Sequence, residues 1–313
     1  MRYLFVLSIL FTTYVYGQDA PNAANATSGV GNAAAEAKFG AVPVNFYTGM
    51  PNVSVPIYNY GSAGSGLSWP VSLEYFSGGI RVGESPGSVG LGWNFNATGA
   101  ITRTVRGMPD DLPTNGFLYS SAVIADVNTY GNQYATDSMD AQQDVFQFNF
   151  KGRSGQFLIG KNKQIVQIPN TKINISYQVS SVDNSSIVSF RVVTEDGTIY
   201  DFATEETTKL TGSNFTFGYS GKSYGSSWWL TDVIAPFGTD TIRFNYTSTT
   251  INAGQSSAQV TYHDDANHLP LWHTSDASAT IQSWQLSSIA FPAQKSLQVV
   301  YSLQYGNEIS KIK

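Results

Sequence analysis

The stretch GGIRVGESPGSVGLGWNFNATGAITRTVRGMPDD, from Gly78 to Asp111, decides the fold of this chain. At its centre Gly90 and Gly92 flank Leu91 and lead into Trp93. Glycines this close together are typical of backbone turns at positive φ, or of places where another backbone comes too near for a Cβ atom. Trp93 can bury a large apolar surface if its indole N–H finds an acceptor. We therefore expect an architectural hinge between strands, with Trp93 buried and with Gly92→Val destabilising.

Alternating sequence flanks this hinge on both sides. Downstream, residues 100–106 (AITRTVR) alternate apolar with polar, which indicates a strand with one buried face. Upstream, residues 67–75 (LSWPVSLEY) place every second side chain, all of them apolar, on one face. Further strands are predicted at 42–49, 51–58, 144–150, 155–159, 164–168, 172–179, 187–194, 198–202, 214–217, 227–234, 239–246, 257–262, 282–291 and 297–303.

Two short signals predict turns between these strands. Asp196-Gly197 is a strong hairpin signal, and Pro236-Phe237-Gly238 is a second turn. No segment carries a sustained helical period. The sequence thus predicts an all-β fold of large antiparallel sheets, sandwich-like or part of a β-shell, with no significant helix after the N-terminal segment.

The N-terminal end of the chain indicates export. Arg2 and an apolar run precede Val15-Tyr16-Gly17, which is the pattern of a secretory signal peptide cleaved between Gly17 and Gln18, and the apolar run is too short to span a bilayer. An uncleaved N-terminal anchor is the alternative. We expect a signal peptide at 1–17, a flexible leader at 18–40 and a β-rich domain at 41–313 that divides near the polar connection 107–143.

The final residues, 305–313, enter a new strand, so the chain is expected to be the N-terminal part of a longer product.

Composition narrows the function classes. Charged residues are 12% of the 313 residues, the net charge is −5 and no basic run occurs, which argues against nucleic-acid binding. The 42% hydrophobic content argues against disorder. With no cysteine the chain forms no disulfide and no lipidated N-terminus, so stability comes from core burial.

An ordered series of short motifs carries a family resemblance. The motifs are VSVPIY (53–58), LEY (73–75), GIRV (79–82), VGLGWNF (89–95), GAITR (99–103), RGMPDD (106–111), DVFQFNF (144–150), GQF (155–157), TEDGTIYDF (194–202) and SSWWL (226–230). Their order resembles the N-terminal region of secreted RHS/YD-repeat proteins of the Bacteroidetes and, more distantly, the salmonella plasmid virulence protein B-like leader of toxin-complex proteins. The residues that mark the fold are Gly79, Gly90, Gly92, Trp93, Gly99, Arg103, Gly107, Asp110, Gly197 and Trp228.

The resemblance implies an exported, cell-surface or outer-membrane-associated β-sheet shell, in which later repeats wrap around a C-terminal effector. Partners would then be the downstream shell or effector of the same gene product. The chain departs from that plan because it contains no run of Tyr-Asp repeats, no repeat-associated core signature and no effector.

Two sequence patterns mimic catalytic or phosphate-binding motifs. Residues 83–87 (GESPG) spell a nucleophile elbow at Ser85, but Pro86 lacks the N–H that an oxyanion hole needs and no helix follows. Residues 220–223 (SGKS) end like a P-loop, but Thr216 stands where its first glycine belongs. Neither pattern predicts a site.

Metal sites and cofactors receive little support. His263, His268 and His273 are spaced five residues apart, which suits no common zinc motif. Asp264 with Asp265, or Asp110 with Asp111 near Asn115, could ligate calcium, but neither pair has EF-hand spacing. Metal binding stays open, and no cofactor is expected.

A glycosidase would need two acids across a cleft, and Glu74, Glu84, Asp110, Asp111 and Glu195 are the available carboxylates. Trp228 and Trp229 could stack on sugars, although both lie in an apolar strand pattern that favours core positions. The leading hypothesis is a non-enzymatic β scaffold with no transmembrane segment in the mature chain. A module that binds surface glycans is the alternative, and a hydrolase is the least favoured reading.

Overall fold

The computed structural model describes residues 52–62, 64–76, 86–120, 139–212, 221–261, 271–302 and 308–313. The chain divides into two compact units, Met1–Val53 with Phe76–Gly78, and Ser54–Tyr75 with Gly79–Lys313, and nearly all described residues belong to the second unit. Within the described residues the fold is antiparallel β with no α-helix, which confirms the predicted fold class. The signal peptide expected at 1–17, its expected cleavage site at Gly17 and Gln18, the expected leader and the strand expected at 42–49 lie outside the described residues, and the domain boundaries stay predictions.

The strand that precedes the glycine-rich hinge belongs to a three-stranded sheet. Its order is β1 (Asn52–Gly61), β2 (Ser68–Phe76) and β3 (Trp93–Asn96). Pro56 lies in β1, an edge strand of this sheet, where a missing N–H is tolerated. Tyr60 of β1 stacks on Phe291 at 4.7 Å between ring centroids, and Trp69 of β2 meets Phe244 edge-on at 5.1 Å. Aromatic contacts therefore join this sheet to the larger one.

The larger sheet has twelve strands in the order β7-β6-β5-β4-β11-β12-β13-β10-β9-β8, with β14 and β15 continuing from β13 and an additional β10–β11 pairing. The strands are β4 (Ala100–Thr104), β5 (Val145–Phe150), β6 (Arg153–Ile159), β7 (Ile165–Ile168), β8 (Asn174–Val179), β9 (Ile187–Val193), β10 (Ile199–Gly212), β11 (Ser223–Ile234), β12 (Thr241–Thr261), β13 (Leu271–Phe291), β14 (Lys295–Ser302) and β15 (Glu308–Ile312). A short 3₁₀ turn, η2 (Pro236–Gly238), joins β11 to β12.

The core lies where β5 and β6 face β9. Phe146 of β5 and Phe157 of β6 are stacked at 5.2 Å, and Phe190 of β9 packs against both at 5.5 and 5.6 Å. Trp228 of β11 meets Phe190 edge-on at 4.9 Å, and all four side chains are almost fully buried. The strict alternation of VFQFNF in β5 puts its phenylalanines on this inner face and Gln147 and Asn149 on the outer face.

The predicted turns occur where expected. Gly197 has a φ of 82°, and the N–H of Thr194 donates to the carbonyl of Thr198 at 3.0 Å, so Asp196-Gly197 closes the β9–β10 hairpin. Phe237 and Gly238 also have positive φ in η2. Gly90 and Gly92 have φ of 100° and 76°, which confirms the expected left-handed turns. Trp93 is only half-buried, so the expectation of a buried Trp93 is wrong: its ring lies against Tyr75 at 5.2 Å on the small sheet.

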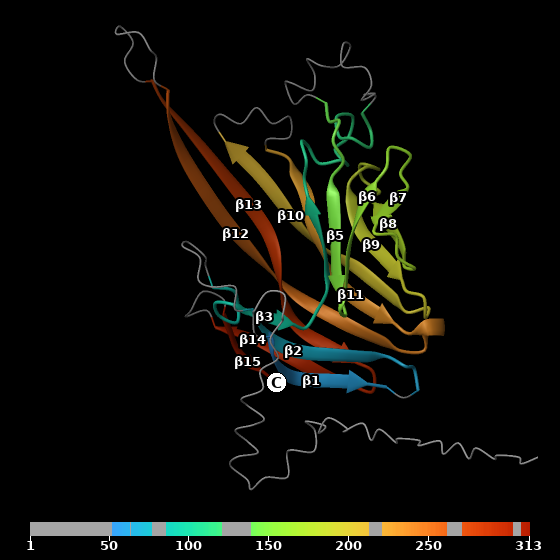
Figure 1. Cartoon of the computed structure of the whole chain (residues 1–313). Coiled ribbons are helices and arrows are strands. Elements are labelled where there is room, and N and C mark those ends of the chain that lie inside the picture. Colours follow the sequence, from blue (N-terminus) through green and yellow to red (C-terminus); the bar gives the residue numbers. More distant parts are fainter. Residues whose placement is uncertain are drawn as a thin grey trace, which may run out of the picture. The chain divides into compact units, whose positions relative to one another are not determined.

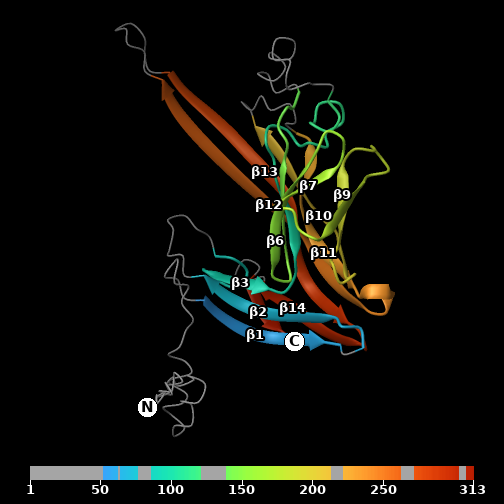
Figure 2. The same ribbon diagram turned by 45° about the vertical axis from the view of Figure 1, so that its right-hand side comes forward.

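The longest hairpin was underestimated from sequence. The prediction of separate strands at 239–246 and 257–262 is replaced by one continuous strand, β12, which pairs with β13 from Arg243–Ala290 to Thr261–Leu271 (Figure 1). Figure 2 shows the same pair extending past the neighbouring strands from a second angle. His273 is a residue of β13, whereas His263, His268, Asp264 and Asp265 lie outside the described residues. The strand expected at 214–217 also lies outside them.

Candidate functional site

Arg103 is the centre of a buried polar cluster. In β4 the alternation of AITRT turns Ile101 and Arg103 inward, and the guanidinium has no exposed surface. Its Nε and Nη2 lie 2.7 and 2.6 Å from Oδ2 of Asp144, and its Nη1 lies 2.8 Å from Oδ1 of Asp111. Nη1 also donates to the carbonyl of Gly225 at 3.3 Å. Burial alone lowers the pKa of Arg103, but the carboxylates of Asp111 and Asp144 outweigh it and raise the pKa, so the cation is retained.

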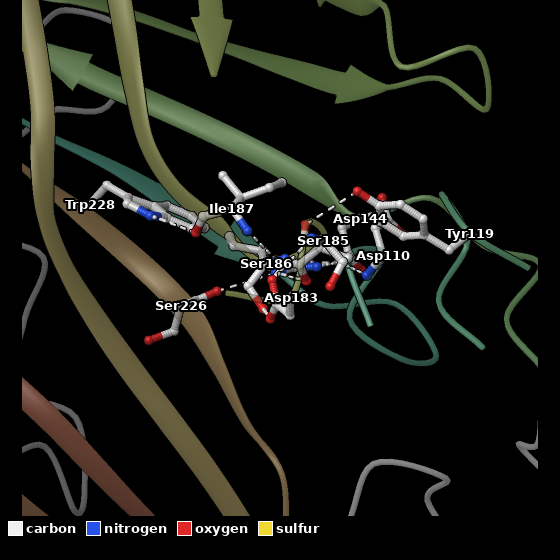
Figure 3. Close-up of polar contacts among 12 residues, drawn as sticks. Asp110, Tyr119, Asp144, Asp183, Ser185, Ser186, Ile187, Ser226 and Trp228 are labelled. Carbon is white, nitrogen blue, oxygen red and sulfur yellow. Dashed lines mark hydrogen bonds and ion pairs between the residues drawn. The ribbon is translucent and has the colours of Figure 1, made fainter. Parts of the chain in front are cut away.

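The two paired carboxylates also accept backbone hydrogen bonds. Oδ1 of Asp144 accepts from the N–H of Arg106 at 2.7 Å, and Oδ2 accepts from the N–H of Asp110 at 2.9 Å. Oδ2 of Asp111 accepts from the N–H of Ile187, the first residue of β9, at 2.8 Å. Each carboxylate thus ties the connection that follows β4 to another element, Asp144 to the start of β5 and Asp111 to β9. Figure 3 shows Asp110, Asp144 and Ile187 of this network.

A third aspartate completes the cluster. Oδ2 of Asp110 accepts from the N–H of Asp144 at 3.1 Å, while its Oδ1 is buried with no partner among the described residues. Burial and then the nearby Asp144 raise the pKa of Asp110 to about 9. Because Asp144 faces Arg103 and Asp110 does not pair with it, Asp110 is the carboxyl that holds a proton at neutral pH.

Asp140 lies at the edge of the same cluster. Its Oδ1 accepts from the N–H of Gln142 at 3.0 Å, and burial raises its pKa to about 6. A Cβ added to Gly107, whose φ is 73°, would come within 2.6 Å of Oδ1 of Asp140. The glycine is therefore required twice, for its backbone conformation and for the close approach of the carboxylate.

The connection after β4 folds tightly over this cluster. A Cβ at Gly116 would lie 2.5 Å from the carbonyl oxygen of Asp110, and the ammonium of Lys161 donates to the carbonyls of Phe117 and Ser120. Met108 and Leu112 are buried and form a small apolar cluster of their own. Residues 107–120, part of the connection 107–143 that was expected to be loop-like, are thus held by close backbone contacts, by Lys161 and by a small apolar cluster.

The turn before β9 is held by a matching set of contacts, shown in Figure 3. Oδ1 of Asp183 accepts from the N–H groups of Ser185 and Ser186, both at 3.0 Å. The hydroxyl of Tyr119 donates to the carbonyl of Asn184 at 3.1 Å, and the indole N–H of Trp228 donates to the carbonyl of Ile187 at 3.3 Å. This turn, the acidic connection and β11 form one hydrogen-bonded unit.

The cluster is suited to holding strands together rather than to reacting. Every charged oxygen of Asp111 and Asp144 faces Arg103 or a backbone N–H, and no group of three or more described His, Cys, Asp or Glu side chains could hold a metal ion. Asp110 and Asp111, the pair considered for calcium, are buried, and Asp111 is neutralised by Arg103.

The other candidate acids are scattered. Glu74 on β2 accepts from the amide of Asn96 at 2.9 Å, and Glu195 in the β9–β10 turn pairs with Arg153 at 3.0 Å. Glu84 and Ser85 lie outside the described residues, as does Gly79. Among the described residues the structure brings together only Asp110 and Asp111 of the acids considered for glycoside hydrolysis.

The remaining fold markers occupy packing positions. A Cβ at Gly99 would lie 2.6 Å from the Cβ of Phe150, so this glycine is a point of close strand contact. Trp228 is fully buried, whereas its neighbour Trp229 is half-buried on the opposite face. Sequence reasoning did not identify Asp144 as the partner of Arg103; an arginine at an inward position of an alternating strand was the signal that buried acids must lie opposite.

The outward face of the same strands contains a polar groove of about 550 Å³. It is lined by Asn94, Phe95, Asn96, Thr98, Gly99, Ala100, Thr102, Gln147, Phe148, Asn149, Ser154, Gly155, Gln156 and Trp229. From sequence, Gly99 of this set is expected only as a fold marker, and Trp229 is the one residue considered for ligand contact, as a sugar-stacking residue.

Comparison with known proteins gives one structural likeness to report. No family model and no curated protein matches the chain. Among solved structures, the chain is similar to the N-terminal domain of effector protein SpvB from Salmonella typhimurium strain LT2, with 12% sequence identity, a TM-score of 0.32, and coverage of 82% of this chain and 75% of that chain. This neighbour corresponds to the salmonella virulence protein B part of the resemblance seen in the sequence.

Proposed function

We propose that this chain is a non-enzymatic, exported β scaffold: the N-terminal part of an RHS/YD-repeat shell that carries or encapsulates a C-terminal effector. One observation carries the proposal. Five fold-marker residues of the ordered motif series hold structural positions: Gly99 at a strand contact, Arg103 and Asp110 in the buried cluster, Gly197 in a hairpin and Trp228 in the core.

The distribution of charged groups supports a structural role. Of the acids considered for glycoside hydrolysis, Asp111 is buried against Arg103, and together with Asp144 it accepts backbone N–H groups that hold three chain segments together. A general acid or base must reach a substrate proton, and a carboxylate whose oxygens are all engaged inside the protein does not. In the described part of the chain, no helix is long and apolar enough to span a membrane.

The sheet also has edges to which further strands can add. β12 pairs with β11 only at Thr241–Arg243, and along the rest of its length it pairs with β13 alone among the described strands. An open edge presents unpaired backbone N–H and C=O groups that accept another strand. Such an edge fits a domain that continues into a larger β structure.

The decisive experiment is to read the DNA downstream of codon 313 and to image the complete product by electron microscopy. The proposal expects an open reading frame that continues into Tyr-Asp repeats and a hollow shell in the images. A stop codon directly after Lys313, or a continuation without such repeats, overturns it. N-terminal sequencing of the secreted protein tests export, with Gln18 expected as the first residue.

A carbohydrate-binding role is the second candidate, and the polar groove beside Trp229 favours it. The structure gives a hydrolase no comparable observation in its described part. Turnover on broad ester and glycoside panels would contradict the assignment as a non-enzyme.

A further inference from the structure

The outward face of β4, β5, β6 and β11 is organised into two rows of side chains that cross the strands. In one row Ser227, Thr102, Gln147 and Gln156 are direct neighbours on adjacent strands. In the other, Trp229, Ala100, Asn149 and Ser154 are direct neighbours. Adjacent strands are ~4.8 Å apart, so each row runs roughly 14 Å across the sheet. β5 and β6 can be followed side by side in Figure 1.

The row side chains have unused hydrogen-bonding capacity. Thr102, Gln147, Asn149, Ser154 and Gln156 are all exposed, and the side chains of the three amide residues make no hydrogen bond to another described residue. Each amide offers two N–H donors and an acceptor oxygen. The groove therefore presents closely spaced donors and acceptors to whatever fills it.

The groove is also uncharged. None of its fourteen lining residues is Asp, Glu, Lys, Arg or His. A charged ligand would be desolvated here without an opposite charge, which is unfavourable, and a nucleic acid would find no cation for its phosphates. A purely apolar ligand would cover the amide groups and leave them unpaired. The matching ligand is neutral and carries many hydroxyl groups.

Aromatic rings lie at one end of this face. A smaller cavity of about 250 Å³ shares Asn94, Phe95, Thr98 and Trp229 with the groove. It is further lined by Trp93, Tyr246, Trp284 and Tyr301, among other residues. Trp229 and Tyr246 have ring centroids 6.2 Å apart and are tilted by 41°. Aromatic faces of this kind pack against the C–H faces of sugar rings while polar groups bind the hydroxyls.

The polar tips of these aromatic residues are largely engaged inside the protein. The hydroxyl of Tyr246 donates to the carbonyl of Leu230 at 2.6 Å, and the indole N–H of Trp284 donates to the carbonyl of Glu205 at 2.7 Å. These bonds fix the rings, and fixed rings lose less conformational entropy when a ligand binds. The indole nitrogen of Trp229 is itself buried and has no hydrogen-bond partner among the described residues, so this residue offers a ligand its ring rather than its N–H.

We propose that this groove binds a neutral oligosaccharide, which stacks on Trp229 and hydrogen-bonds to the amides of Gln147, Asn149 and Gln156. The inference does not depend on the scaffold function, since a shell segment and a free module can both bind glycans through this face.

The test uses the complete purified chain and isothermal titration calorimetry. The probes are hexasaccharides of the cello-, xylo-, chito-, manno- and malto- series, with oligogalacturonate and a heparin fragment as charged probes. We expect at least one neutral series to bind, and the charged probes to bind at least tenfold more weakly. Loss of several hydrogen bonds in Gln147→Ala/Asn149→Ala/Gln156→Ala lowers that affinity by about tenfold or more.

The matched control is Gln178→Ala, which removes an exposed glutamine from β8, outside the groove. It leaves affinity unchanged, and far-UV circular dichroism of both variants equals that of the unmodified chain. No binding of any neutral probe, equal affinity in the triple variant, or preference for a charged probe overturns the proposal.

Discussion

The two faces of the sheet formed by β4, β5 and β6 differ in an unusual way. The inner face carries the ionised groups, with Arg103 fully enclosed, while the outer face carries neutral Thr102, Gln147 and Gln156. Charges usually occupy the surface and neutral groups the core. Here the ionic pairs fix a long connection from the inside, and the surface is left uncharged for hydrogen bonding. The difference assigns stability to one face and recognition to the other.

The largest effect that separates the faces is expected from Arg103→Met. Removing the guanidinium leaves Asp111 and Asp144 buried without a counter-charge, and breaking a buried pair on one side costs about 3–5 kcal/mol. Urea denaturation followed by tryptophan fluorescence measures the loss in the free energy of unfolding.

The control for this change is Arg191→Met. The Arg191 side chain is 55% exposed and pairs with Asp201 at 2.7 Å. An exposed pair contributes less than about 1 kcal/mol. If the two variants lose equal stability, the buried cluster does not have the role assigned to it.

The second-largest expected effect is a pH dependence of the folding stability, which the buried aspartates cause. The pKa of Asp110 is raised to about 9 and that of Asp140 to about 6, mainly by burial. The folded chain therefore binds more protons than the unfolded chain above about pH 4, the ordinary aspartate pKa. Stability falls as pH rises, up to about pH 6 for Asp140 and about pH 9 for Asp110, by at most about 1.4 kcal/mol per pH unit for each group. Thermal unfolding at about pH 5.5 and about pH 8.5 measures this fall.

Asp110→Asn isolates the contribution of the most strongly shifted group. Asparagine keeps an acceptor for the N–H of Asp144 and is neutral at every pH. The variant is expected to lose less stability than the unmodified chain between about pH 5.5 and about pH 8.5. Stability that is constant or rises with pH in the unmodified chain would contradict the assignment of the proton to Asp110.

Neighbouring residues of β6 give a smaller contrast between the faces. A Cβ at Gly155 would meet ring atoms of Phe148 at 2.6 and 2.8 Å, so Gly155→Ala forces a buried ring to move. Such overpacking costs about 1–3 kcal/mol. Ser154→Ala, one residue away on the outer face, changes stability by less than about 0.5 kcal/mol. Chemical denaturation of the two variants side by side tests the contrast, and equal losses would place Ser154 in the core.

Local patterns predicted much of the fold because local physics produces it. Alternation in VFQFNF identified β5, and Asp196-Gly197 identified the β9–β10 hairpin. The middle of β12 escaped prediction because residues 247–256 are mostly Thr, Ser, Ala, Asn and Gln without an alternating apolar face. That strand forms through continuous backbone pairing with β13, which a single strand's sequence does not show.

The sites were harder to predict because their residues come together over long distances in the chain. Arg103 and Asp144 are 41 residues apart, and the connection between them has no periodic pattern. The groove needed the register of four strands, since Thr102, Gln147 and Gln156 become neighbours only when β4, β5 and β6 pair. Trp229 was singled out from its type alone, and its half-buried position separates it from the core residue Trp228.

The smallest expected effect on stability tests whether the outer face is open. Gln147 is exposed and its amide makes no hydrogen bond to another described residue, so water replaces it at little cost in Gln147→Ala. We expect a change in the free energy of unfolding below about 0.5 kcal/mol, measured by urea denaturation. A loss above about 1 kcal/mol would mean that the amide is paired inside the folded chain. In that case another part of the protein covers the groove, and the face could not receive an oligosaccharide without displacing it.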